Sequence, residues 1–172
     1  MNIQGQAALV TGAGSGLGEA TARELARLGA KVAVLDLNMD NAQRVAQDIG
    51  GVAVHCNVSD PDSMAQAIQT AAAAHGPARI LMQIAGIGTA KRVVGKDGKA
   101  APLEEFAKVI NVNLIGTYNA ARLFAEACAK LDPLEDGARG VMVFTASVAA
   151  FDGQVGQQAY SASKAGVVGM TL

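Results

Sequence analysis

Aromatic residues are scarce in this 172-residue chain: they make up 3% of the sequence, and tryptophan is absent. Because 51% of the residues are nevertheless hydrophobic, the core has to be built from Ala, Val, Leu and Ile. Twenty glycines and short Val/Ile/Leu runs fit a buried parallel sheet covered by helices rich in small residues. The length suits one domain, residues 1–172, with a sizeable core.

Strong charge and long apolar runs are also lacking. The net charge of −1 gives no electrostatic case for binding nucleic acid or an anionic membrane, and no apolar run approaches the length of a membrane span. No Lys or Arg precedes Arg23, which argues against a secretory signal or transit peptide. Cys56 and Cys128 lack the spacing of a metal or redox motif, so we expect buried free thiols, no metal site and a cytoplasmic location.

Short apolar runs alternate with longer amphipathic segments. This order predicts βαβ units with right-handed crossovers, and therefore an α/β fold with a Rossmann-type, doubly wound parallel sheet. We expect strands at 7–11, 31–36, 52–57, 80–84 and 141–146. We expect helices at 16–28, 40–49, 62–75, 103–129 (with a break near Asn111) and from 157 onward. Two long loops, 87–102 and 132–139, are functional segments or surface insertions, and the first has room for a small hairpin around Asp97 and Gly98.

A glycine-rich stretch, TGAGSGLG at residues 11–18, follows the first expected strand and opens the first helix. Gly12 allows a tight turn, Gly16 lets the backbone approach a pyrophosphate, and Gly18 lets the helix pack close to the sheet. The free N–H groups and the positive dipole end of the helix then face the phosphates. In this context the stretch predicts a dinucleotide-binding loop.

The second expected strand ends in an acidic residue, Asp36, which lies 18 residues beyond Gly18. A carboxylate at this position accepts hydrogen bonds from the hydroxyls of the adenosine ribose and repels a 2′-phosphate. Its neighbours Ser15 and Leu37 offer no compensating cation. The sequence therefore favours NAD over NADP, with a solvated Asp at a strand end as the alternative.

Tyr160 and Lys164 lie four residues apart, so they share one face of the last helix. A free tyrosine has a pKa of about 10, and a cation about 4 Å away would favour its deprotonated form. Such a tyrosine can exchange a proton with an alcohol or ketone while hydride moves at the adjacent carbon. Ser147 follows the fifth strand and can hold the substrate oxygen, although a capping serine is the alternative.

Together these stretches resemble the short-chain dehydrogenase/reductase family. TGAGSGLG matches the cofactor loop of that family, and NVNLIGTYNAAR, TASVAAF and YSASK match its later motifs in the same order. The resemblance implies that Ser147, Tyr160 and Lys164 are catalytic and that Asn113 holds a water in a proton relay from Lys164. From the residues alone, Asn111 or Asn113 is equally a simple helix break. Tyr118 matches no catalytic position, so we expect it to be a packing residue.

The resemblance also implies a set of cofactor contacts, which includes Tyr160 and Lys164. The other expected contacts are Gly12, Ser15, Gly16, Leu17, Gly18, Asp36, Asn57, Val58, Ala85 and Gly86.

Three features depart from the family pattern. The usual Asn-rich motif after the fourth strand reads QIAG, so Gln83 replaces a shorter Asn. Asn57 stands where the family often has an Asp that holds the adenine amino group. The sixth and seventh strands of the family are missing, so we expect this sequence to be part of a longer enzyme that is truncated at its C-terminus.

A narrower similarity, over TASVAAFDGQVGQQAYSASKAGVVGMTL and both long loops, is to the type 2 3-hydroxyacyl-CoA dehydrogenases, also known as type 10 hydroxysteroid dehydrogenases. It implies an NAD-dependent oxidoreductase of fatty acid metabolism that interconverts 3-hydroxyacyl-CoA and 3-oxoacyl-CoA and forms a homo-oligomer, a dimer or tetramer. Alternatives are a 3-oxoacyl-[acyl-carrier-protein] reductase, a hydroxysteroid dehydrogenase acting on other secondary alcohols, or a non-catalytic NAD-binding module.

Overall fold

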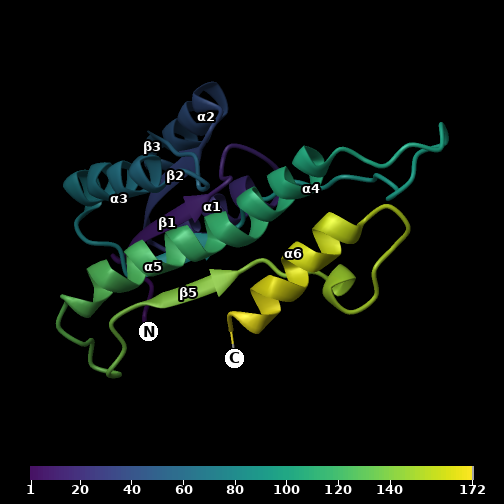
Figure 1. Ribbon diagram of the computed structural model, residues 1–172. Coiled ribbons are helices and arrows are strands. Elements are labelled where there is room, and N and C mark those ends of the chain that lie inside the picture. Colours follow the sequence, from purple (N-terminus) through teal and green to yellow (C-terminus); the bar gives the residue numbers. More distant parts are fainter. Residues whose placement is uncertain (172) are drawn as a thin grey trace.

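The structure, a computed structural model, describes residues 1–171. Its centre is a sheet of five parallel strands in the order β3-β2-β1-β4-β5 (Figure 1). The strands are β1 (Ala7–Thr11), β2 (Lys31–Asp36), β3 (Val52–His55), β4 (Ile80–Gln83) and β5 (Val141–Phe144). From β1, the chain adds β2 and then β3 on one side, and it then crosses back and adds β4 on the other side of β1. This reversal creates the crevice at the carboxyl ends of the strands in which doubly wound sheets bind ligands.

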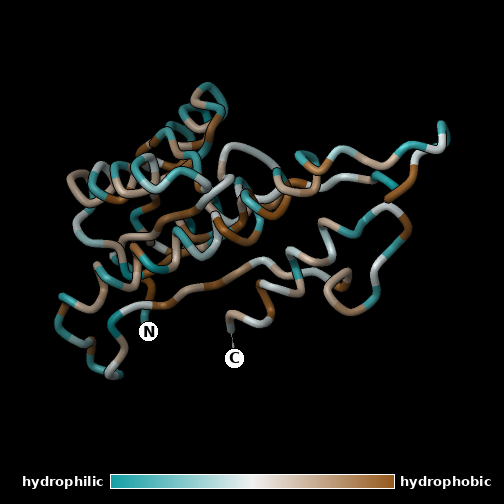
Figure 2. Tube along the Cα trace, in the orientation of Figure 1, coloured by the Kyte–Doolittle hydropathy of each residue, from teal (hydrophilic) through white to brown (hydrophobic). Residues whose placement is uncertain are grey.

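The helices cover both faces of the sheet. They are α1 (Gly16–Arg27), α2 (Met39–Ile49), α3 (Pro61–His75), α4 (Leu103–Ile110), α5 (Gly116–Ala129) and α6 (Gln158–Gly169). One hydrophobic cluster joins the strands to α1 and α2, and the other joins them to α3 and α5. In Figure 2 the hydrophobic stretches run along the strands and the inner faces of these helices. The α/β fold predicted from the alternation of elements is confirmed, because the five apolar runs form five parallel strands and helices pack on both faces of the sheet.

The predicted break near Asn111 is a π-helical turn, Asn111–Ile115, which joins α4 directly to α5. The backbone N–H of Gly116 donates to the carbonyl of Asn111, five residues earlier, and this wider turn keeps the helix continuous. A short 3₁₀ helix, Val148–Ala150, lies between β5 and α6. Helix α6 packs against this 3₁₀ helix, the π-helical turn and α4.

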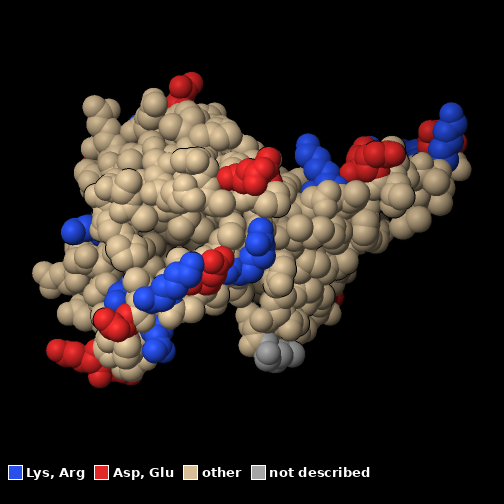
Figure 3. Space-filling view, turned by 60° about the vertical axis from the view of Figure 1, so that its left-hand side comes forward, with Lys and Arg blue, Asp and Glu red and all other residues tan. Residues whose placement is uncertain are grey.

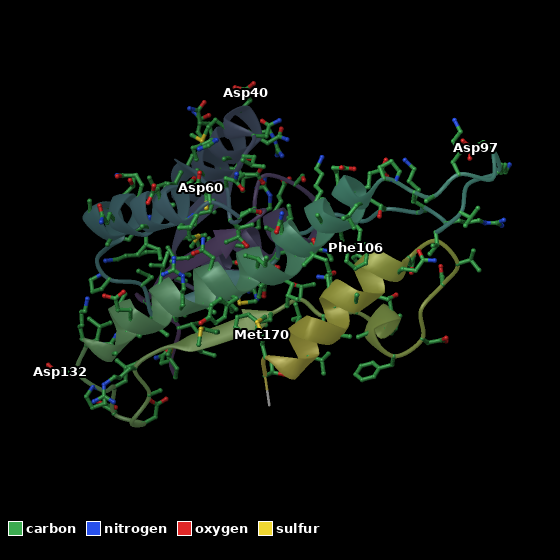
Figure 4. The ribbon with its side chains drawn as sticks, viewed as in Figure 1. Asp40, Asp60, Asp97, Phe106, Asp132 and Met170 are labelled. Carbon is green, nitrogen blue, oxygen red and sulfur yellow. The ribbon has the colours of Figure 1, made fainter. Side chains whose placement is uncertain are left out.

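Both long loops are outside the core. In the 87–102 loop, Val94 and Ala100 form an antiparallel bridge, and the Gly95 N–H donates to the Lys99 carbonyl. The predicted small hairpin is therefore present, with Asp97 near its projecting tip (Figure 4). The 132–139 loop, which begins at Asp132, lies at the opposite end of the molecule (Figure 4).

Two further sequence predictions concern cysteine and tyrosine. Cys56 and Cys128 are buried free thiols, as predicted. Tyr118, expected to be a packing residue, is instead 59% exposed on α5, so that expectation is wrong for the single chain. Among residues 1–171, no helix is both long and apolar enough to cross a membrane.

Candidate active site

The glycine-rich loop joins β1 to α1 with very little space around its backbone. Gly12 has φ +64°, and a Cβ at this position would lie 2.9 Å from the Cα of Ala85. Gly16 also has a positive φ, +54°, whereas a Cβ on Gly18 would lie 2.1 Å from the Gly12 carbonyl oxygen. The turn, the approach of β4 and the packing of α1 thus require glycine at these positions. The loop leaves the N-terminal N–H groups of α1 facing the crevice, where they favour an anion.

Asp36 ends β2 beside this loop. Its Oδ2 accepts a hydrogen bond from the Gly14 N–H (2.8 Å), and its Oδ1 accepts one from the Asn38 N–H (2.9 Å). The carboxylate is therefore fixed at the edge of the crevice with its remaining lone pairs available to a ligand. A cation that the sequence reasoning missed also reaches the loop, because Arg44 on α2 donates to the Gly14 carbonyl oxygen (3.1 Å).

A cavity of about 400 Å³, here called the glycine-loop cavity, lies between the loop and the ends of β2, β3 and β4. All ten of the predicted cofactor contacts outside α6 line it: Gly12, Ser15, Gly16, Leu17, Gly18, Asp36, Asn57, Val58, Ala85 and Gly86. The structure thus brings these residues to one place, and their contact with a cofactor stays a prediction.

The Cys56 thiol also lines the glycine-loop cavity, next to Asn57. Burial raises the pKa of Cys56 to about 12, so this thiol is neutral and a poor nucleophile at physiological pH. The side-chain carbonyl of Asn57 accepts the Ser59 N–H (3.1 Å), and its second lone pair is free to accept another donor.

A second cavity of about 570 Å³, here called the Tyr160 cavity, contains Tyr160, Lys164, Thr145 and Gln157 in its wall. Its wall also includes residues of the glycine-loop cavity, namely Leu17, Ile84, Gly86 and Ile87. The two cavities are therefore neighbours that share one wall at the ends of β1 and β4. The 87–102 loop contributes its first residues to this wall, whereas the 132–139 loop does not line either cavity.

Lys164 lies one helical turn after Tyr160 on α6, as the spacing predicts. Its Nζ atom is 5.6 Å from the centroid of the Tyr160 ring and donates a hydrogen bond to the Thr145 carbonyl oxygen (2.5 Å). Lys164 is only 4% exposed, and this burial lowers its pKa from the ordinary value. The Thr145 carbonyl was not predicted from the sequence, because Thr145 directly follows β5 and lies 19 residues before Lys164.

Ser147 and Asn113 do not line the Tyr160 cavity. The Ser147 Oγ accepts the Ala149 N–H (3.2 Å) and caps the 3₁₀ helix, so the capping alternative describes its present contact. This acceptor role leaves the hydroxyl hydrogen of Ser147 free to be donated. The structure therefore gives the position of Ser147, at the end of β5, without a direct contact with Tyr160.

The Asn113 side chain is buried and fully engaged. Its Oδ1 accepts the Ile87 N–H (2.8 Å), while its Nδ2 donates to the Ile87 carbonyl (2.9 Å) and to the Ser163 Oγ (3.1 Å). Ser163 in turn donates to the Tyr160 carbonyl (2.7 Å). Asn113 thus holds the β4 loop to the helix of Tyr160. Ser163, which sequence reasoning treated only as a small residue, completes this link, and its place inside YSASK was the available signal.

Gln83, the departure from the usual Asn, remains inside the sheet. Its Oε1 accepts a hydrogen bond from the Thr11 hydroxyl (2.9 Å), and that hydroxyl accepts the N–H groups of Ile84 and Ala85 (3.1 Å each). The longer side chain therefore helps to position the strand end that separates the two cavities. In the part of the chain that the structure describes, no group of three or more His, Cys, Asp or Glu side chains could hold a metal ion.

The face drawn in Figure 3 shows no large field of one charge, because Lys and Arg side chains lie there next to Asp and Glu side chains. This distribution agrees with the overall net charge of −1. The two cavities have the size expected of a site for a small ligand.

Comparisons with known proteins agree with this geometry. A family profile described as short chain dehydrogenase matches residues 6–172. The 3-hydroxyacyl-CoA dehydrogenase type-2 of Drosophila melanogaster is 46% identical over 99% of this chain and 68% of that protein, and the human protein of this name is 41% identical over 99% and 67%.

The crystal structure of a 3-hydroxyacyl-CoA dehydrogenase type-2 from Mycobacterium avium superimposes with a TM-score of 0.87 and 41% identity, and the match covers 96% of this chain and 66% of that one. The sequence therefore spans about two thirds of the length of these relatives. Together with the site geometry, these matches show that the chain belongs to the short-chain dehydrogenase family, whose members are oxidoreductases acting on CH–OH donors.

Proposed function

We propose that this protein is an NAD-dependent oxidoreductase that interconverts a secondary alcohol and a ketone, with 3-hydroxyacyl-CoA and 3-oxoacyl-CoA as its substrate pair. The observation that carries the proposal is the shared wall of the two cavities. Asp36 lies in one cavity and the Tyr160–Lys164 pair in the other, so a dinucleotide extending from the first would bring its reactive end to the second. The names of the relatives support the acyl-CoA substrate.

The residues of the glycine-loop cavity fit NAD. The N-terminus of α1 would hold the pyrophosphate, Asp36 would accept from the ribose hydroxyls, and Asn57 would accept from the adenine amino group. When bound, the nicotinamide would supply a hydride acceptor for the alcohol carbon. Lys164 would also donate to the nicotinamide ribose, since this residue lines the Tyr160 cavity.

In the alcohol-to-ketone direction, the Tyr160 oxygen removes the hydroxyl proton while the carbon loses hydride. Lys164 places a cation beside the ring and favours the negatively charged oxygen on Tyr160. Ser147 donates to the substrate oxygen and orients it. In the reverse direction the same Tyr160 hydroxyl returns the proton to the ketone oxygen.

Asn113 completes the assignment as the residue that supports the proton relay. Its side chain is occupied by Ile87 and Ser163, and its backbone carbonyl, which already accepts the Thr117 hydroxyl (2.6 Å), would hold a relay water with its second lone pair. The π-helical turn at Asn111–Ile115 changes the hydrogen-bond spacing of the backbone around this carbonyl.

We also propose that the protein forms a homo-oligomer, a dimer or tetramer. Helices α4 and α5 with the π-helical turn expose Leu103, Phe106, Ile115 and Tyr118, between 42% and 74% of each side chain. Large apolar side chains along two neighbouring helices are typical of subunit contacts. A cytoplasmic location is part of the same proposal, and imaging of the tagged protein tests it.

The test is a comparison of substrates and cofactors with the full-length protein. We expect 3-hydroxybutyryl-CoA to be oxidised with NAD⁺ and much more slowly with NADP⁺, measured by the absorbance of the reduced cofactor. Faster turnover of an acyl-carrier-protein thioester with NADPH would favour the reductase alternative instead. Faster turnover of a hydroxysteroid would favour the steroid alternative. Dinucleotide binding without turnover of any of these substrates would favour a non-catalytic module.

A further inference from the structure

Two arginines converge on one carboxylate, Glu19, in the first turn of α1. Arg23 donates to Glu19 Oε1 from its Nε (3.0 Å) and Nη2 (2.8 Å). Arg44, which comes from α2, donates to Oε1 from Nη1 (2.9 Å) and to Oε2 from Nη2 (2.8 Å). The hydrogen bonds from Arg44 and then Arg23 lower the pKa of Glu19 to about 2. Glu19 is therefore ionised at any physiological pH, and both of its oxygens are engaged.

Arg44 also contacts the cofactor loop directly. Its Nη2 donates to the Gly14 carbonyl (3.1 Å), and the N–H of the same Gly14 donates to Asp36 Oδ2 (2.8 Å). The loop and α2 are in close contact here, since a Cβ on Gly14 would lie 2.9 Å from both the Asn41 Cβ and Asp36 Oδ2. The guanidinium of Arg44 is thus separated by a single glycine from the carboxylate that is proposed to bind the ribose.

An arginine at this place is the group that would neutralise a 2′-phosphate on the ribose. Here its Nη1 and Nη2 atoms form a two-pronged contact with Glu19, so a phosphate would have to displace a paired carboxylate. The other arginine is also occupied, because Arg23 Nη2 donates to Asp48 Oδ2 (2.7 Å) as well as to Glu19. The charges of the four side chains cancel, which leaves the charge of Asp36 uncompensated.

We propose that Glu19 is a specificity-determining residue, which disfavours NADP by keeping Arg44 engaged away from the ribose 2′ position. Asp36 then acts by direct repulsion, and Glu19 acts by withholding the nearest cation. This inference rests on the proposed function in one respect, that the glycine-loop cavity holds the adenosine half of a dinucleotide.

The experiment measures the dissociation constants of NAD⁺ and NADP⁺ by calorimetry in the full-length protein. In the Glu19→Gln variant, we expect NADP⁺ to bind about tenfold more tightly, the effect of one released charge-assisted hydrogen bond, with little change for NAD⁺. The gain should disappear in the Glu19→Gln/Arg44→Gln double variant. Glu24→Gln is the matched control, because Glu24 lies on the same helix and, among residues 1–171, pairs with Arg27 alone, so it should leave both constants unchanged.

Two results would overturn the proposal: an unchanged ratio of NADP⁺ to NAD⁺ affinity in Glu19→Gln, or a gain that persists without Arg44. If Glu19→Gln folds poorly, Glu19→Asp shortens the side chain by one methylene while keeping the charge, and a smaller change of the ratio in the same direction is expected. A parent protein that binds neither dinucleotide contradicts the proposed function, and this inference with it. A parent that binds both, with no effect of Glu19, contradicts this inference alone.

Discussion

The crevice has two ends: the glycine-loop cavity, here called the cofactor end after its proposed role, and the Tyr160 cavity, here called the chemical end. The strands that support these two ends differ in how deeply they are buried. At the cofactor end, β2 lies between β1 and β3, and its residues Val32 to Leu35 are 0–2% exposed. At the chemical end, β5 has a strand neighbour on one side, and Val141, Met142 and Val143 are 40–43% exposed. The cofactor end is therefore held by the core itself. The chemical end is held by the packing of α6 on α4, the π-helical turn and the 3₁₀ helix, and by polar contacts from Lys164 to Thr145 and from Asn113 to Ser163.

The largest expected effect is a loss of NAD⁺ affinity on substitution of Gly18, the most closely packed glycine of the cofactor end. In Gly18→Ala the new Cβ would lie 2.1 Å from the Gly12 carbonyl oxygen, so the loop has to move. We expect NAD⁺ affinity to fall by about 100-fold or more, the size of an overpacking penalty of about 3 kcal/mol, as measured by calorimetry.

Gly169→Ala is the matched control for this change. A Cβ on Gly169, at the end of α6, meets no atom of residues 1–171 within 4 Å, and its backbone has no positive φ. We expect unchanged NAD⁺ affinity and a small gain in stability from the better helix former. Equal loss of affinity in both variants would mean that the loop is not the binding element.

Because β2 is buried and β5 is partly exposed, the same Val→Ala substitution should lower the free energy of unfolding by different amounts on the two strands. Val34→Ala on β2 removes a side chain that is 0% exposed, and should lower the free energy of unfolding by about 2–3 kcal/mol. Val143→Ala on β5, 43% exposed, should cost less than about 1 kcal/mol. Urea unfolding of each variant measures both values. Similar costs would show that β5 is enclosed in solution, for instance by another subunit.

A smaller effect, on the pH dependence of stability, is expected from the buried Lys164 at the chemical end. Because burial lowers the pKa of Lys164, the folded state releases its proton at a lower pH than the unfolded state, whose lysine has a pKa of about 10.4. The cost of the buried charge is thus fully present near neutral pH and is lost as the pH rises toward that value.

The stability of the cofactor-free parent should therefore rise relative to Lys164→Met as the pH increases from neutral into this window. Thermal unfolding of both proteins over a pH series measures the difference, and the comparison cancels contributions from other groups, such as the Cys56 thiol. A difference that is constant with pH would contradict a shifted pKa for Lys164.

Local features of the site were predictable from the sequence. The glycines of residues 11–18 and the Tyr160–Lys164 pair depend on spacing within one turn or one helix, which the chain itself dictates. The position of Asp36 was predictable because it depends only on the combined length of α1 and β2. The strand limits were less accurate, because β3 ends at His55 and not at Asn57. Asn57 leaves the sheet since its backbone N–H donates to Ser63 and its side chain accepts from Ser59.

The contacts that hold the site were not predictable in the same way. Arg44 reaches Glu19 across 25 residues, and Asn113 reaches Ser163 across 50. Such contacts depend on how helices from separate βαβ units pack together, and periodicity within a single helix carries no information about that. A buried polar side chain such as Ser163 is distinguished from a simple spacer only by its tertiary partners.

The central claim is that the Tyr160 hydroxyl transfers the proton in the reaction, and one measurement tests it most directly. Turnover of 3-hydroxybutyryl-CoA and the affinity for NAD⁺ are measured in the full-length parent, in Tyr160→Phe, and in Tyr118→Phe as a control on the exposed face of α5. The account predicts that Tyr160→Phe lowers turnover by about 100-fold or more while NAD⁺ still binds, and that Tyr118→Phe changes neither. Turnover that survives largely intact in Tyr160→Phe would contradict it.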